Sequence, residues 1–245
     1  MKMSEYQEKY WNAIASQLNI IIEPFISTKE YLTVTKNYLF DLVGPRCLSR
    51  NYSNSNRYFS LVFSGYLEVI RSWDRLQDIE TFIERFPSLK SKISKSRYLS
   101  YHIENYFSEI YIFHNRLVDY AKKILRANKH SHDYDDNKAI IDILINGVDT
   151  HFASFISLRG SHVHKYRFED DDMFRSLQWE DIISSPPANS LPFYRKTANY
   201  MIRKARKNWI ERIKEYNSGN SLLLDIYFKA LYSIVFVKSG KLKNI

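Results

Sequence analysis

Apolar residues recur at helical spacing along most of the chain, and the breaks in this pattern fall at proline, glycine or polar segments. The stretch 6–21 predicts a first amphipathic helix that closes before Pro24. The stretch 27–42 predicts a second helix, because its first four residues have the form of a capping box and Gly44-Pro45 stops it. The Ser- and Asn-rich segment 46–56 carries no apolar period, so we expect a loop there.

Two long apolar stripes follow, and they predict two long helices. The first stripe covers 59–86 and is ended by Pro87, and the second covers 99–124. An antiparallel return of these helices in a bundle would bury both stripes. The polar segment 130–136 is expected to be an exposed loop whose Asp136 caps the next helix, although its His and Asp residues also stand close enough to hold a metal.

The fifth predicted helix ends in charged and polar residues. Its apolar stripe runs from Ile141 to Phe155, and the next positions on the same side of the helix are Arg159 and His162. A guanidinium on a core-facing stripe is costly unless it pairs with a carboxylate, faces a cleft or binds an anionic ligand. This irregularity marks the end of the helix as a candidate functional site.

Further helices are expected toward the C-terminus. A short helix at 173–179 stops at Pro186-Pro187, and a basic helix covers 195–214. The segment 217–220, Asn-Ser-Gly-Asn, predicts a turn, and 222–237 predicts a final, mostly buried helix. The expected fold class is all-α.

Composition supports this fold class and indicates the cellular compartment in which the protein works. With only six Gly and six Pro in 245 residues, the chain has few of the residues that form the tight turns of an all-β fold. Cys47 is the only cysteine, which excludes an intrachain disulfide and a four-thiolate zinc site and indicates a reducing, cytoplasmic setting. The first twenty residues lack the pattern of a signal or transit peptide, and the apolar runs are shorter than the roughly 20 residues that cross a bilayer. We therefore expect a soluble protein that does not enter a membrane.

The net charge of +9 and the pI near 9.4 favour polyanionic partners such as RNA. Residues 195–214 hold eight basic side chains and one acidic side chain on a helix with an apolar face. The candidate RNA-binding residues on it are Arg195, Lys196, Arg203, Lys204, Arg206 and Lys207. The alternative is a solvated helix face in a chain of biased composition, which needs no ligand.

The segment Arg159-Gly160-Ser161-His162-Val163-His164 resembles the R-x(4–6)-H signature of the HEPN family, the higher eukaryotes and prokaryotes nucleotide-binding domains. From about Tyr98 onward the chain is also similar to the family in layout, with a long helix, a polar loop and a second long helix that ends in the motif. The position after the arginine is often Asn, Asp or His in the family, and here it is Gly160.

The resemblance implies a HEPN-like helical bundle over 91–245, with 1–90 as an N-terminal helical elaboration packed on it or as part of one domain. It implies a homodimer that acts as an endoribonuclease without a metal or another cofactor. Many such proteins belong to toxin–antitoxin, CRISPR-linked or phage-defence systems, so an antitoxin or effector protein is an expected partner.

The chemistry needs the residue types of this motif. Cleavage of RNA by its own 2′-hydroxyl requires proton transfer near neutral pH and stabilisation of a phosphorane that carries extra negative charge. His164 suits the proton transfer, and Arg159 suits the stabilisation because its guanidinium is a permanently charged, forked donor. Residues five apart point about 140° apart on an ideal helix, so either the helix is distorted at Gly160 or His162 joins the site. Glu104 is the expected partner of Arg159 in the absence of RNA, unless it is a solvent-facing charge.

Three alternatives stay open. In one, His162 is a simple polar residue at a helix end, and in another it forms a His-x-His metal site with His164, without an evident third ligand. In the third, the protein is a non-catalytic helical module that binds a nucleotide or a partner protein, with Arg159 in an ion pair. The sequence has no nucleophilic serine elbow and no glycine-rich phosphate loop, which argues against common hydrolase, kinase and dinucleotide-binding functions.

Overall fold

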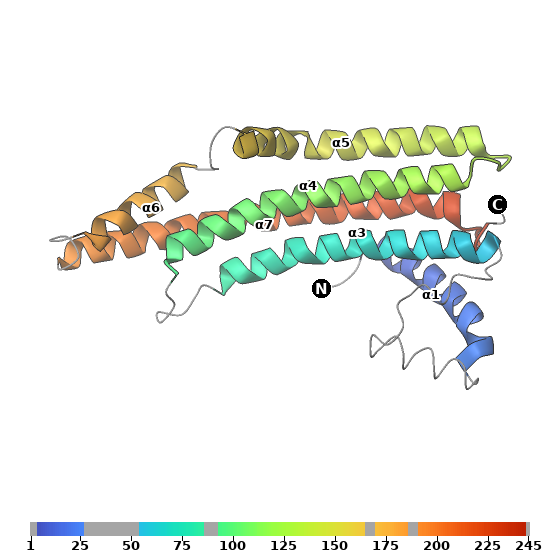
Figure 1. Ribbon diagram of the computed structural model, residues 1–245, viewed down its shortest axis with the longest axis horizontal. Coiled ribbons are helices and arrows are strands. Elements are labelled where there is room, and N and C mark those ends of the chain that lie inside the picture. Colours follow the sequence, from blue (N-terminus) through green and yellow to red (C-terminus); the bar gives the residue numbers. More distant parts are fainter. Residues whose placement is uncertain (1–3, 27–53, 86–92, 165–169, 186–190, 244–245) are drawn as a thin grey trace. The chain divides into compact units, whose positions relative to one another are not determined.

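The computed structural model describes residues 4–26, 54–85, 93–164, 170–185 and 191–243, without the side chains of 21–26, 54–56 and 158–164. This part of the chain is all-α, as expected, and forms a helical bundle with no strand beyond an isolated bridge between Phe236 and Leu242 (Figure 1). Its helices are α1 (Glu5–Ile26), α3 (Asn54–Glu84), α4 (Lys95–Ala127), α5 (Tyr134–His164), α6 (Asp171–Ser184) and α7 (Pro192–Val235).

The N-terminal helices agree with the apolar pattern apart from their ends. α1 runs through Pro24, so the predicted stop before this proline is wrong. Pro24 lies in the final turn, where its missing amide removes only one backbone hydrogen bond of the helix. α3 begins at Asn54, inside the loop predicted for 46–56, and ends before Pro87 as expected. The helix predicted for 27–42 lies outside the described residues.

The middle helices α4, α5 and α6 are confirmed, but one predicted cap is wrong. α5 begins at Tyr134, so Asp136 is not its cap. Asp135 and Asp136 instead lie in the first turn, where a carboxylate is favoured by the positive end of the helix dipole.

The C-terminal third is organised differently from the prediction. The turn predicted for 217–220 is wrong, because this segment is helical and joins the basic and apolar stretches into one helix, α7, of 44 residues. After α7 the chain folds back at Gly240, whose φ of 80° lies in the left-handed region that favours glycine. The amide of Val237 then donates to the carbonyl of Lys241 at 2.9 Å.

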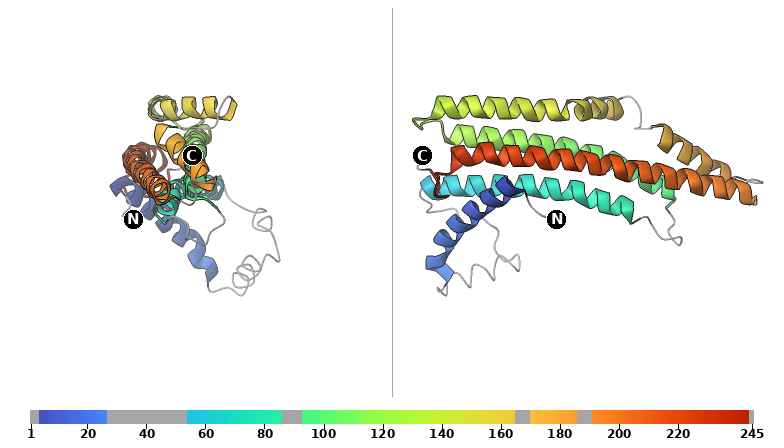
Figure 2. Two further views of the ribbon diagram at one scale, coloured as in Figure 1. Left: turned by 90° about the vertical axis from the view of Figure 1, so that its left-hand side faces the viewer. Right: turned by 180° about the vertical axis from the view of Figure 1, so that it is seen from behind.

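Two compact units share the helices. Unit 1 comprises 1–68, 118–146 and 222–245, and unit 2 comprises 69–117 and 147–221. α1 belongs to unit 1 and α6 to unit 2, whereas α3, α4, α5 and α7 contribute a segment to each. Within each unit the segments of α3, α4 and α7 run side by side, and α5 lies along α4 (Figures 1 and 2).

The core of unit 1 is built around two tyrosines whose hydroxyl groups meet. Tyr10 of α1 is fully buried against the rings of Tyr66 and Phe228, with ring centroids 5.8 and 4.9 Å away. The Tyr10 hydroxyl lies 2.6 Å from that of Tyr120, which donates to the carbonyl of Val62 at 2.9 Å, so Tyr10 is the donor of the pair. Burial raises the pKa of both tyrosines, which therefore remain neutral at physiological pH. This chain of hydrogen bonds joins α1, α4 and α3.

Buried polar side chains also join the helices of unit 2. Asn217 Oδ1 accepts from the Tyr106 hydroxyl at 2.8 Å, and Asn217 Nδ2 donates to Glu80 Oε2 at 2.9 Å. Three residues along α7, Asn220 Oδ1 lies 2.9 Å from Nε2 of His151. The two asparagines thus bond to α3, α4 and α5 rather than to their own backbone, so residues that favour a turn in isolation are compatible with a continuous helix.

One helix has the length and composition to cross a membrane. Within the described residues this is the part of α5 from Tyr134 to Ser157, with a mean hydropathy of 1.3, and 22% of its apolar window is buried. Most of this window is exposed, and a single helix of this kind is weak evidence for a membrane span.

The packing of Gly65 generates a first prediction. A Cβ at Gly65 would overlap Cδ2 of the Tyr120 ring, which lies directly on the backbone of α3. We expect Gly65→Ala to lower the free energy of unfolding by about 1–3 kcal/mol, the range for overpacked cores. Gly147→Ala is the matched control, because its Cβ meets nothing within 4 Å and alanine should add up to about 1 kcal/mol through helix propensity. Urea unfolding followed by circular dichroism measures both changes, and an equal response would contradict this packing.

The polar contacts of Asn217 generate a second prediction. Asn217→Ala removes the acceptor of the Tyr106 hydroxyl and the donor to Glu80, so we expect a loss of about 1–3 kcal/mol in the free energy of unfolding. Asn199→Ala, an exposed change on the same helix, should be neutral or slightly stabilising. A loss for Asn199→Ala as large as for Asn217→Ala would show that the buried contacts contribute little.

Candidate functional site

The motif recognised in the sequence occupies the last turns of α5. Its backbone is α-helical from Arg159 through Gly160 to His164, and Figures 1 and 2 show that these turns leave the direction of the rest of the helix. The side chains of Arg159, His162 and His164 lie outside the described residues. Their mutual geometry therefore stays a prediction.

Glu104, the expected partner of Arg159, lies on α4 and is half-buried. Its Oε1 lies 3.5 Å from the hydroxyl of Ser100, and its backbone carbonyl accepts from Ser108 at 3.1 Å. The carboxylate thus has a local partner one turn away on its own helix. The ion pair with Arg159 stays a prediction.

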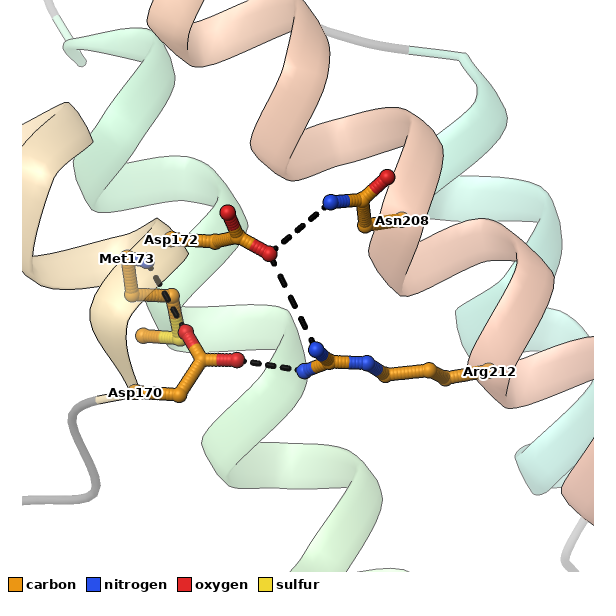
Figure 3. A network of polar contacts seen from close by, with 5 residues as sticks. All are labelled: Asp170, Asp172, Met173, Asn208 and Arg212. Carbon is orange, nitrogen blue, oxygen red and sulfur yellow. Dashed lines mark hydrogen bonds and ion pairs between the residues drawn. The ribbon is translucent and has the colours of Figure 1, made fainter.

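The chain after the motif is anchored to α7 by a network of polar contacts. Asp170 caps α6, because its Oδ1 accepts from the Met173 amide at 2.9 Å. Figure 3 shows Asp170 and Asp172 pointing at one guanidinium, that of Arg212 on α7. The Nη atoms of Arg212 lie 2.5 Å from Asp170 Oδ2 and 3.8 Å from Asp172 Oδ2, and Asn208 donates to Asp172 at 2.9 Å.

This network borders an open cleft of about 450 Å³. The cleft is lined by Asp170, Asp171, Asp172, Arg175 and Arg212. Arg212 also lies over the ring of buried Trp209, 5.0 Å from its centroid. Arg212 pairs with Asp170 and Asp172, so the network fixes where α6 begins, seven residues after His164. The sequence displays three consecutive aspartates at this point, but not the arginine that pairs with two of them.

The six basic residues proposed for RNA binding lie in two kinds of environment. Arg195, Lys196, Arg203, Lys204 and Lys207 are exposed. Arg206 is half-buried, and its guanidinium donates to the carbonyls of Ile83, at 3.0 Å, and Glu84. These carbonyls belong to the end of α3, where backbone acceptors lack helical partners. Arg206 thus holds α7 against α3 in unit 2.

A histidine–aspartate pair that the sequence did not suggest joins α4 to α5. Nε2 of His114 lies 2.6 Å from Oδ1 of Asp149, and 11% and 54% of the two side chains are exposed. The carboxylate fixes the orientation of the largely buried imidazole, which ties the two helices together.

In the described part of the chain no three His, Cys, Asp or Glu residues form a group that would hold a metal ion.

Comparison with known proteins adds no relative. No protein-family model, curated protein or solved structure matches the chain.

The cap at Asp170 generates a third prediction. Asp170→Ala removes a helix cap and the closest partner of Arg212, so we expect about 1–2 kcal/mol less protection of α6 amides against hydrogen exchange. Asp171→Ala deletes an exposed neighbouring carboxylate of the same helix turn and serves as the control, with a loss below about 1 kcal/mol. Equal protection in the two variants would contradict an anchoring role for Asp170.

Proposed function

We propose that this protein is a metal-independent endoribonuclease of HEPN type that cleaves RNA at Arg159 and His164. The observation that carries the proposal is the R-x4-H motif at the C-terminal end of a long helix in an all-α bundle. The exposed basic side chains of α7 lie in unit 2, the unit that also contains the motif, and they supply attraction for a phosphate backbone.

The reaction proposed is an internal transesterification. The 2′-hydroxyl oxygen of RNA attacks the adjacent phosphorus, the bond from phosphorus to the 5′-oxygen breaks, and a 2′,3′-cyclic phosphate and a 5′-hydroxyl result. One proton leaves the 2′-hydroxyl and another reaches the 5′-oxygen, which are the tasks for His164. Arg159 stabilises the negative charge that develops on the non-bridging oxygens.

A homodimer belongs to this proposal. The reaction needs one group that accepts a proton and one that donates a proton, and a single His164 has one titrating side chain. Two copies of the motif lining a shared cleft would supply both groups, and His162 is the alternative second group within one chain. We place the protein in the cytoplasm, in a toxin–antitoxin or phage-defence setting, with an antitoxin or effector protein as partner.

Removal of either motif side chain tests the proposal and is the fourth prediction. We expect Arg159→Ala and His164→Ala to lower the rate of RNA cleavage by about 100-fold or more, because each removes a group that acts in the transition state. EDTA should leave the wild-type rate unchanged. Light scattering should give twice the mass of one chain for wild type and for both variants.

Matched controls separate the motif from a general loss of charge. Arg71→Ala and His132→Ala remove exposed residues of the same types and should leave cleavage at the wild-type rate. Cleavage that survives both motif substitutions would refute the proposal. A wild-type protein that cuts no RNA would favour the non-catalytic module, in which Arg159 serves an ion pair.

A further inference from the structure

We infer that one exposed side of α7 binds single-stranded RNA by alternating base stacking with phosphate contacts. The residues that form it, called the α7 stripe below, are Phe193, Lys196, Tyr200, Arg203 and Lys207. The inference rests on the proposed function for the identity of its ligand, and it names the form of RNA and two aromatic contacts.

The spacing of these residues places them on one side of the helix. Lys196, Tyr200, Arg203 and Lys207 are separated by steps of four, three and four residues, and Phe193 precedes Lys196 by three. At a rise of about 1.5 Å per residue, the stripe from Lys196 to Lys207 extends along roughly 16 Å of the helix. This length allows contact with several consecutive nucleotides.

The aromatic rings of the stripe are unusually exposed. Phe193 and Tyr200 have relative exposures of 69% and 63%, whereas most aromatic residues of the described helices are buried, as is Trp209 on α7 itself, or half-buried. A ring held in water contributes little to the fold, because the stabilisation from an aromatic side chain comes from its burial. Tyr200 lies between the cations Lys196 and Arg203 of the stripe, an arrangement in which a base stacks on the ring while its phosphates meet the flanking charges.

The segment of α7 that carries the stripe is basic. Between residues 192 and 210 the sequence contains no acidic residue, and Arg195 and Lys204 add two exposed cations beside the stripe. The first carboxylate is that of Glu211, 3.9 Å from Lys207 Nζ. Arg206 is not a member, because its guanidinium binds the carbonyl groups at the end of α3.

The chemistry of the stripe favours a single strand over other polyanionic surfaces. Stacking on a side chain requires bases whose faces are open, as in single strands and loops, whereas a duplex covers them with neighbouring bases. Helices that lie on anionic membranes bury a broad apolar face. The stripe instead presents two separated rings among cations and has no aliphatic side chain.

Binding of a non-cleavable oligonucleotide by the full-length protein tests the role of Tyr200 and is the fifth prediction. The probe is a fluorescent, fully 2′-O-methylated single-stranded RNA, which lacks the attacking hydroxyl, so affinity is measured without cleavage. We expect Tyr200→Ala to weaken binding about five-fold or more and Tyr200→Phe to keep wild-type affinity, because phenylalanine retains the stacking ring. Tyr101→Ala, a change at a similarly exposed tyrosine of α4, is the control and should bind as wild type.

The cations of the stripe are tested by salt dependence. The triple variant Lys196→Gln, Arg203→Gln and Lys207→Gln should reduce the slope of log affinity against log salt by about 2, since each phosphate contact on a single strand adds about 0.7. The control triple, Lys122→Gln, Lys129→Gln and Lys238→Gln, removes the same charge from exposed positions of unit 1. It should leave the slope nearly unchanged.

Several outcomes would overturn the inference. Wild-type affinity in Tyr200→Ala, equal slopes in the two triple variants, or tighter binding of duplex than of single-stranded RNA would each do so. Binding to phosphatidylserine vesicles without binding to the oligonucleotide would assign the stripe to a membrane surface instead. Stripe-dependent binding by a protein that cleaves no RNA would sustain the inference and refute the proposed nuclease, so the two failures are distinguishable.

Discussion

Hydrogen bonds between buried side chains of different helices fix the register of this bundle. Apolar stripes on long helices repeat every turn, so a shift of one helix by one turn would leave apolar groups opposite apolar groups. A shift would separate Tyr120 from Tyr10 in unit 1 and Asn217 from Glu80 in unit 2, leaving buried donors and acceptors without partners. The polar contacts therefore select one alignment from several that the apolar surface alone would accept.

The same contacts explain which parts of the fold are visible in the sequence. The period of apolar residues lies within each helix, and it correctly predicts α3, α4, α5 and α6. The segment 217–220 has the composition of a turn, but its conformation depends on Tyr106 and His151, which are 111 and 69 residues away from their partners in the sequence. The residue pattern of 217–220 alone contains no information about partners so far away in the sequence.

Part of the candidate site can likewise be read from the sequence, and part depends on residues that are distant in the sequence. The letters of the R-x4-H motif and its place at a helix end are readable from the sequence, because both are local. The pairing of Arg212 with Asp170 spans 42 residues, and the use of Arg206 by the carbonyl of Ile83 spans 123. Basic residues of α7 that look equivalent in the sequence thus differ in the structure, because distant segments bind some of them. The net charge of +9 therefore overstates how much positive surface is open to a ligand.

The core of unit 1 has a consequence for the order in which the protein is completed during synthesis. Tyr10 packs on Phe228 and on Phe236, which lie more than 200 residues later in the sequence, with ring centroids 4.9 and 5.2 Å away. The ribosome must release the chain through α7 before these rings can meet, and α1 has no complete packing surface until then. A nascent chain interrupted anywhere before α7 therefore exposes the aromatic face of α1 to chaperones and proteases, which makes this core a check on translation through α7.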